Sequence, residues 1–146
     1  MSNTKATPQD ALVILKLYSL RREAEMRKAR DYMLRYFWPE TLADVQKIMA
    51  SSGDDNRYCR MVYSYWNMAA ALVNHGAVNA ELFAETEGEI YVFYAKIQPF
   101  LPELRKTNPQ FLMNIDRFLD STPSARQKLA AAEKRLPGMR ERLQKS

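Results

Sequence analysis

Apolar residues recur at spacings of three and four through most of this chain, and the breaks in that pattern fall at proline or glycine. This spacing places apolar side chains on one side of an α-helix. The longest example runs through residues 58–72, at Tyr58, Met61, Val62, Tyr65, Ala69 and Leu72. With only 4 glycines in 146 residues, a turn-rich β architecture is disfavoured. We predict an all-α fold.

Prolines that follow capping residues mark the expected helix starts. Thr7-Pro8, Asn108-Pro109 and Thr122-Pro123 each pair an N-cap residue with proline at the first helical position. Because no breaker follows Pro8 until Pro39, the first helix is expected to cover about residues 8–37. Further helices are expected at 39–50, 80–98, 109–119 and 123–136, with another turn or two at 100–105. One more is expected to follow an N-cap at Asp54 or Asp55 and to continue to about Asn74, within 54–74. Together these predict a single antiparallel bundle of about five or six helices with a long N-terminal helix.

The expected domain boundaries follow from the same signals. Residues 1–7 are polar and are predicted to form a disordered tail, and residues 8–136 the helical bundle domain. The helix at 54–74 should be central and should pair with the helix at 80–98 as an antiparallel hairpin. Pro137-Gly138 should stop the last helix. This leaves residues 137–146 as a basic C-terminal tail.

The segment from Ala11 to Leu20 is apolar on nearly all sides of its predicted helix. Such a helix needs partners on two sides, either other helices of the same chain or a second copy. We therefore expect a homodimer, with Val13 and Leu17 as candidate self-association residues. Ten residues interrupted by Lys16 are too short for a membrane span, which needs about 20. Attachment of this segment to a membrane surface stays open.

Charge is distributed unevenly along the chain. Residues 1–38 carry 8 basic and 4 acidic groups, residues 39–100 carry 4 and 8, and residues 101–146 carry 10 and 5. The basic ends can neutralise the acidic middle within the fold or across a dimer, or they can form a surface for nucleic acid or anionic lipid. We favour neutralisation because acidic residues interrupt both basic stretches. The candidate basic surface consists of Arg21, Arg22, Arg27, Lys28, Arg30 and Arg35.

Few residues have the pattern of a catalytic or metal site. Glu81, Glu85 and Glu89 stand four residues apart and would share one helix face, as an acidic docking strip for arginines or, less favoured, a cation site. His75 is the only histidine and is expected to lie in a loop or helix cap, whereas Cys59 has no adjacent catalytic partner. A phosphate-binding glycine loop, a nucleophile elbow and a zinc motif are all absent from the sequence. We predict no cofactor and no metal.

Two groups of aromatic residues could form a base-stacking platform, but on helices they more often fill a core or an interface. The groups are Tyr32, Tyr36, Phe37 and Trp38, and Tyr58, Tyr63, Tyr65 and Trp66. An enzyme pocket near Tyr63, Trp66 and Glu85 is a minor alternative.

Two segments carry a resemblance to known sequences. They are RDYMLRYFWPETLADVQKIM and YWNMAAALVNHGAVNAELFAETEGEIYVFYAKIQPFLPELR, within about residues 30 to 105. They resemble a family of uncharacterised bacterial helical domains of unknown function. The resemblance implies an all-helical domain, often with an N-terminal membrane segment that this chain is expected to lack. It implies no catalytic residues.

Taken together, these features favour a non-enzymatic interaction or scaffold domain that self-associates. The alternative is a nucleic-acid-associated helical protein that uses the basic residues of the first and last helices. A single cysteine and an N-terminus unlike a secretory signal favour the cytoplasm.

Overall fold

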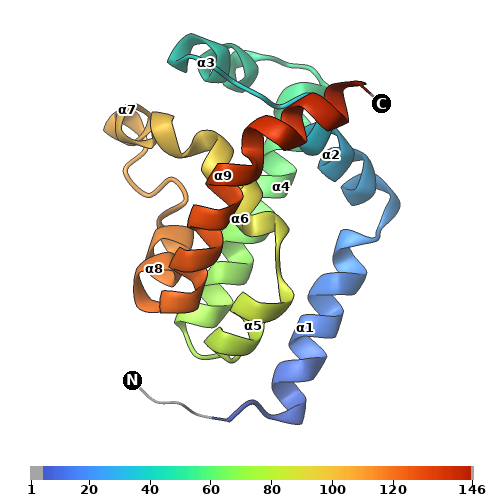
Figure 1. Ribbon diagram of the computed structural model, residues 1–146, viewed down its shortest axis with the longest axis vertical. Coiled ribbons are helices and arrows are strands. Elements are labelled where there is room, and N and C mark those ends of the chain that lie inside the picture. Colours follow the sequence, from blue (N-terminus) through green and yellow to red (C-terminus); the bar gives the residue numbers. More distant parts are fainter. Residues whose placement is uncertain (1–4, 146) are drawn as a thin grey trace.

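The computed structural model describes residues 5–145, and it contains no strand in that range (Figure 1). The all-α prediction is therefore confirmed. The elements are α1 (Pro8–Arg21), α2 (Ala24–Arg35), α3 (Leu42–Ala50), α4 (Asp54–Asn74), α5 (Ala80–Thr86), α6 (Glu89–Ile97), a short 3-10 helix (Gln98–Phe100), α7 (Leu101–Thr107), α8 (Met113–Ser121) and α9 (Pro123–Lys145). Residues 1–4 of the predicted tail lie outside the described residues. Thr7, at the end of that tail, is the N-cap of α1.

Local capping chemistry accounts for several of the boundaries. Thr7 and Thr41 each form a capping box, with Asp10 and Asp44 respectively, at the starts of α1 and α3. Gly76, with φ of 79°, follows the end of α4 in the left-handed region that favours glycine. The predicted end of α4 at Asn74 and the extra helical turns near residue 100 are confirmed. The N-cap predicted at Asp54 or Asp55 is wrong, because the N-cap is Gly53 and both aspartates lie in the first turn.

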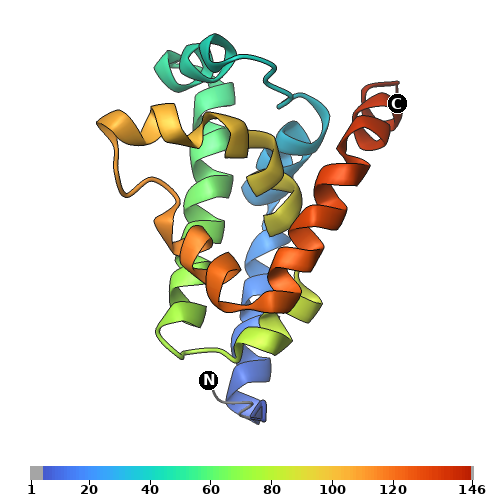
Figure 2. The same cartoon turned by 60° about the vertical axis from the view of Figure 1, so that its left-hand side comes forward.

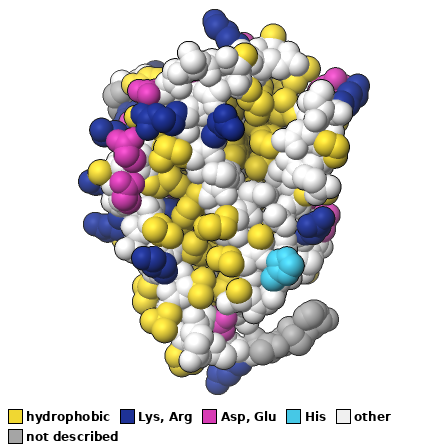
Figure 3. Space-filling model, turned by 180° about the vertical axis from the view of Figure 1, so that it is seen from behind, with side chains coloured by type: hydrophobic (Ala, Val, Ile, Leu, Met, Phe, Trp, Pro, Cys, Tyr) yellow, Lys and Arg dark blue, Asp and Glu magenta, His cyan; other side chains and the backbone are white. Residues whose placement is uncertain are grey.

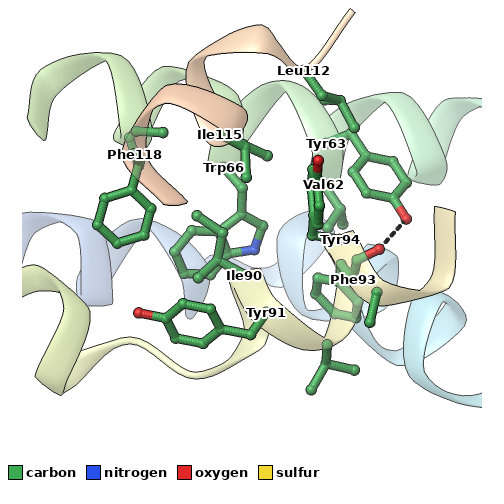
Figure 4. Close-up of a cluster of buried hydrophobic side chains, with 14 of the residues drawn as sticks. Val62, Tyr63, Trp66, Ile90, Tyr91, Phe93, Tyr94, Leu112, Ile115 and Phe118 are labelled. Carbon is green, nitrogen blue, oxygen red and sulfur yellow. Dashed lines mark hydrogen bonds between the residues drawn. The ribbon is translucent and has the colours of Figure 1, made fainter. Parts of the chain in front are cut away.

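Helix α4 is central, as predicted, since α2, α3, α5 and α8 all pack against it. The most enclosed element is α6. Every residue from Ile90 to Ile97 is buried. Helix α6 lies in the middle of the fold (Figure 2), where the Tyr63 hydroxyl of α4 reaches the Phe93 carbonyl. Helices α2 and α8 pack along α4, whereas α9 packs along α6. The buried side chains form one cluster with members from α1 to α9, part of which is shown in Figure 4.

The long helix predicted for residues 8–37 is wrong, because the chain breaks between α1 and α2. Arg22 ends α1 and Glu23 caps α2, with its own carboxylate accepting a hydrogen bond from the Met26 N–H at 3.1 Å. We call Arg22 and Glu23 the elbow. Its cause lies in contacts with distant residues, described below.

The helix predicted for residues 80–98 is also wrong, since it is broken at Glu87 and Gly88. Distant donors occupy the carbonyls that would continue it. The Tyr91 hydroxyl and the Lys128 ammonium donate to the Ala84 carbonyl at 2.9 and 2.7 Å. Lys128 also donates to the Glu85 carbonyl at 2.9 Å. The α5 helix therefore ends early.

The helix predicted to start at Asn108-Pro109 begins instead at Met113. Leu112 precedes it with φ of 56°, a left-handed conformation that is strained for leucine, and its side chain is buried. The side-chain oxygen of Asn67, on α4, accepts hydrogen bonds from the N–H groups of Asn114 and Ile115. The cap of α8 is thus supplied by another helix rather than by Asn108.

The predicted C-terminal tail is wrong as well, because α9 continues through Pro137 to Lys145. A proline inside a helix costs about 3 kcal/mol. Contacts beyond it offset that cost. Arg140 forms an ion pair with Glu40 at 2.9 Å, and the Arg35 guanidinium donates to the Leu143 carbonyl at 3.4 Å. Residues 137–145 are therefore held by tertiary contacts.

Candidate functional site

The break between α1 and α2 and the break between α5 and α6 lie next to each other, joined by two ion pairs. We call the residues at this junction the elbow cluster: Arg21, Arg30, Tyr65, Trp66, Glu87 and Glu89. Neither break was expected from the sequence, so the cluster was not expected either.

Arg30 makes the best-oriented contacts of the elbow cluster. Its guanidinium donates to both carboxylate oxygens of Glu89, at 2.8 and 2.7 Å. The remaining nitrogen donates to the backbone carbonyl of Arg21 at 3.0 Å. The Glu89 carboxylate raises the pKa of Arg30 above its ordinary value. Arg30 therefore fixes the end of α1 against the start of α6.

Arg21 and Glu87 form the buried ion pair of the cluster. The two side chains are 13% and 1% exposed, and the Arg21 Nη2 to Glu87 Oε1 distance is 3.2 Å. Arg21 Nε, Glu87 Oε1 and Trp66 Nε1 are buried without a hydrogen-bond partner among residues 5–145. Burial raises the pKa of Glu87, against the opposing effect of Arg21. The two charged groups are therefore close enough for an ion pair, but some of their buried polar atoms form no hydrogen bond.

Three polar contacts and one apolar face dock α1 onto α4 and α5. The Tyr65 hydroxyl donates to the Leu17 carbonyl at 2.6 Å, and the Asn79 N–H donates to Asp10 Oδ1 at 2.9 Å. The Arg21–Glu87 pair is the third contact. Leu17 is buried, with Val13 and Ile14 packed against the same core. The cluster therefore acts to hold α1 in place.

The candidate basic surface is largely used within the chain. Arg21 and Arg30 belong to the elbow cluster, Lys28 pairs with Glu25, and Arg35 pairs with Asp31. Arg22 donates to the Tyr18 hydroxyl at 2.8 Å, and Arg27 is exposed. The arrangement agrees better with neutralisation than with one continuous phosphate-binding face.

The three glutamates of the predicted strip do not share one helix. Glu81 and Glu85 lie on α5, whereas Glu89 begins α6. Glu89 pairs with Arg30, Glu81 accepts a hydrogen bond from the Ser124 hydroxyl at 2.9 Å, and Glu85 is exposed. No group of three His, Cys, Asp or Glu residues that could hold a metal ion occurs within residues 5–145.

The two residues predicted for self-association face inward. Leu17 is 2% exposed and Val13 is half-buried, so Leu17 is covered by its own chain. On the opposite side of α1, Leu12 and Leu15 are exposed to solvent, and Tyr18 and Leu20 are exposed at its two edges. Figure 3 shows apolar side chains gathered on the surface of the molecule seen from behind. We call these four residues the α1 outer face: Leu12, Leu15, Tyr18 and Leu20, which are 65, 61, 48 and 39% exposed.

The aromatic residues divide between the core and the surface. Phe37, Tyr63 and Trp66 are buried, and the Tyr63 hydroxyl donates to the Phe93 carbonyl at 2.6 Å (Figure 4). Tyr36 is 69% exposed beside Tyr32, with ring centroids 6.2 Å apart. Three of the eight residues thus belong to the core, and Tyr32, Tyr58 and Tyr65 are partly buried against it.

His75 and Cys59 take structural positions. His75 is the exposed C-cap of α4, as predicted. Cys59 is buried, and burial raises the pKa of its thiol to about 12. A thiol in that state is a poor nucleophile at neutral pH.

Two hollows lie near the start of α4, away from the elbow cluster. A surface groove of about 590 Å³ is lined by Ser51, Ser52, Gly53, Asn56, Arg57, Arg60, Met61 and Ser64. A cavity of about 30 Å³ is lined by Ile48, Met49, Asn56, Cys59, Arg60, Tyr63 and Phe111. Trp66 and Glu85 line neither of them, so these hollows do not correspond to the pocket considered from the sequence.

Lys96 is a buried cation that sequence reasoning missed. It is 5% exposed, its ammonium lies 3.6 Å from the centroid of the Trp38 ring, and it donates to the Met33 carbonyl at the end of α2. Arg140 lies over the same Trp38 ring at 5.9 Å. Burial, and then the charge of Arg140, lowers the pKa of Lys96 to about 7. Its place in a strongly apolar run was the only available signal.

We predict that stability rises with pH because of Lys96. The unfolded lysine keeps its ordinary pKa of 10.5, so above about pH 7 the unfolded state binds more protons than the folded state. The free energy of unfolding should increase by about 1 kcal/mol per pH unit between about pH 7 and 8.5. Urea titrations at several pH values measure this slope.

Lys96→Met should abolish most of that slope, and Lys134→Met, at an exposed position of α9, should leave it intact. The raised pKa values of Cys59 and the buried tyrosines act in the opposite direction, but mainly above about pH 9. An equal slope in the wild type and Lys96→Met would contradict the assignment.

The fold and the elbow cluster define a class: an all-helical protein in which ion pairs between distant residues join the helix breaks. The chain belongs to the family described as Domain of unknown function (DUF4760), which matches residues 6–121. The resemblance to a helical domain family of unknown function is thereby confirmed. No curated protein and no solved structure matches the chain. Among the described residues, none of the helices has the length and apolar character to cross a membrane.

Proposed function

We propose that this chain is a non-enzymatic interaction or scaffold domain that forms a homodimer through the α1 outer face. The observation that carries the proposal is the two-sided character of α1. One side docks through Leu17, Val13 and Ile14, while the opposite side presents Leu12 and Leu15 to solvent. Exposed apolar residues gathered on one helix are typical of interaction sites.

A second copy of the chain is the occupant that best fits this face. In a two-fold symmetric dimer, the α1 outer face of one copy packs against the same face of the other copy, and each buries the other's exposed leucines. A stable interface buries about 800 Å² on each partner. Since four partly exposed side chains supply less than that, the contact also includes the exposed Lys16 and Ser19 on the same helix. Tyr18, held by Arg22, supplies a rigid aromatic group suited to such a contact.

The non-enzymatic part of the proposal is supported by the use of the charged residues. The arginines and glutamates of the elbow cluster bind one another, and burial suppresses the Cys59 thiolate. We also propose a cytoplasmic location, because Cys59 is a free thiol.

Leu15→Glu should convert the dimer into a monomer. Glutamate in place of Leu15 removes apolar contact from the dimer interface and loses water there, whereas in the monomer it stays solvated. We expect at least a tenfold weaker association. Sedimentation equilibrium or light scattering over a range of concentrations measures it. Ala130→Glu makes a charge change at an exposed position of α9 and is the matched control.

A wild-type chain that stays monomeric at high concentration would contradict the homodimer. Should such a monomer bind vesicles of anionic lipid through Leu12 and Leu15, the outer face would be a membrane-surface element instead. Salt-sensitive binding of RNA or DNA, lost in Arg27→Glu, would favour the nucleic-acid alternative.

A further inference from the structure

The elbow between α1 and α2 has no cause in its local sequence. Residues 21–24 are Arg, Arg, Glu and Ala, which are all good helix formers, and neither glycine nor proline is present. Glutamate is a weak N-cap compared with Ser, Thr, Asp or Asn. Local preference therefore favours one continuous helix through this point, and the bend is imposed by contacts with the rest of the chain.

The backbone bonds at the elbow show what the bend replaces. In a continuous helix the Arg21 carbonyl accepts from the N–H of residue 25. In the bent form it accepts from the Arg30 guanidinium at 3.0 Å. The Met26 N–H is likewise satisfied by the Glu23 carboxylate instead of a backbone carbonyl. Two side chains thus substitute for helical bonds that straightening would restore.

We propose that α1 is exchanged between two copies of this chain, with the elbow straightened in each. This deepens the proposed function, because it rests on α1 as the element of self-association and names a second way in which α1 joins two copies. In the exchanged dimer, α1 of each copy docks on α4 and α5 of the other.

The surface that α1 leaves is specific for another α1. It offers the Tyr65 hydroxyl for the Leu17 carbonyl, the Asn79 N–H for Asp10, and Glu87 for Arg21. A second copy carries the same three groups at the same spacing on a helix of the same length. All three contacts are therefore re-formed between the chains, and the main internal change is at the elbow.

Straightening also prevents α1 from docking on its own chain. A helix of 14 residues is about 21 Å long, so a continuous helix carries Asp10 far from Asn79 of the same copy. The apolar side of α1, including Leu17, is then exposed to solvent until α4 and α5 of a partner bury it. Reciprocal exchange satisfies both copies at once.

Ala24→Pro tests the exchange because it fits only the bent form. Ala24 is the first residue of α2, where proline is well tolerated, and Glu23 before it has φ of −61° and ψ of 145°, the extended conformation that proline requires of its neighbour. In a continuous helix the same proline would clash with the preceding turn. Glu23→Ala is the opposite variant, since it removes the N-cap and favours the straight form. Both positions are exposed.

The experiment separates slow exchange from ordinary association. Concentrated protein is warmed below its unfolding temperature, cooled, diluted and passed at once through a sizing column with light scattering. An exchanged dimer survives dilution because α1 must undock before the chains part. We expect such a dimer in the wild type, about a tenfold larger fraction in Glu23→Ala, and none in Ala24→Pro. Thermal unfolding followed by circular dichroism confirms that both variants are folded.

A persistent dimer in Ala24→Pro, or none in Glu23→Ala, overturns the exchange. The proposed function fails separately. If Leu15→Glu leaves the rapidly reversible dimer unchanged while Ala24→Pro removes the persistent one, exchange stands and association through the α1 outer face falls. If Leu15→Glu removes the reversible dimer while Ala24→Pro keeps the persistent one, the reverse holds.

Discussion

Phe118→Ala should lower the free energy of unfolding by about 3–5 kcal/mol. Phe118 is fully buried, and its ring meets Phe83 edge to face, with centroids 5.2 Å apart at 88°. The centroid of the Tyr91 ring also lies 6.4 Å from that of Phe118 (Figure 4). Alanine removes the ring and leaves a cavity among helices α4, α5, α6 and α8, which rigid neighbours cannot fill. Since domains of this size are stable by about 5–15 kcal/mol, the variant would lose a large share of its stability.

Chemical denaturation followed by circular dichroism measures the loss. Phe118→Leu keeps most of the volume and should cost less than about 1.5 kcal/mol. Phe100→Ala, at a half-exposed position, is the matched control and should cost clearly less than Phe118→Ala. A loss below about 1 kcal/mol for Phe118→Ala would show that this part of the core is loosely packed.

Breaking the Arg21–Glu87 pair from either side should cost about 3–5 kcal/mol, because the remaining charge stays buried without its partner. We expect this for Arg21→Met and for Glu87→Leu, with Glu87 only 1% exposed. The double variant should recover most of the loss, since an apolar pair of similar size avoids the desolvation of two charges.

A double-mutant cycle at neutral pH, measured in urea, gives the coupling between the two residues. The exposed pair of Lys106 and Glu103 provides the comparison and should couple by less than about 1 kcal/mol. Additive losses from Arg21→Met and Glu87→Leu would mean that the two charges act independently, against the role given to the elbow cluster.

The sequence predicted those features that depend on neighbouring residues. The Thr7 and Pro8 start of α1 and the end of α4 near Gly76 follow from capping and backbone preference. The breaks at Glu23 and at Glu87 do not, because the groups that impose them come from elsewhere in the chain. Arg30 and Glu89 are 59 positions apart, and Lys128 is 44 positions from Ala84.

The same distinction explains the candidate site. The sequence suggested Glu89 as a docking partner for arginines of the first or last helix, and Arg30 is such an arginine. It also placed Glu81 and Glu85 on the same helix as Glu89, and that part is wrong because the helix breaks at Glu87 and Gly88. The apolar spacing predicted that α1 has apolar residues on two sides. It could not decide which side faces the core, because leucine occurs on both sides, at Leu15 and at Leu17. Lys96 was overlooked because a lysine in an apolar helix is usually expected to extend to the surface.

Pro137 has a consequence for how the chain opens. Without an N–H at that position, the helical bonds of α9 are interrupted, and the final turns depend on Glu40 and Arg35, about a hundred residues earlier. The last turns of α9 are therefore held mainly by their contacts with the segment between α2 and α3, and less by the turns of α9 that precede Pro137. Amide hydrogens of the last turns would exchange with solvent together with those of that segment, as one cooperative unit of local unfolding.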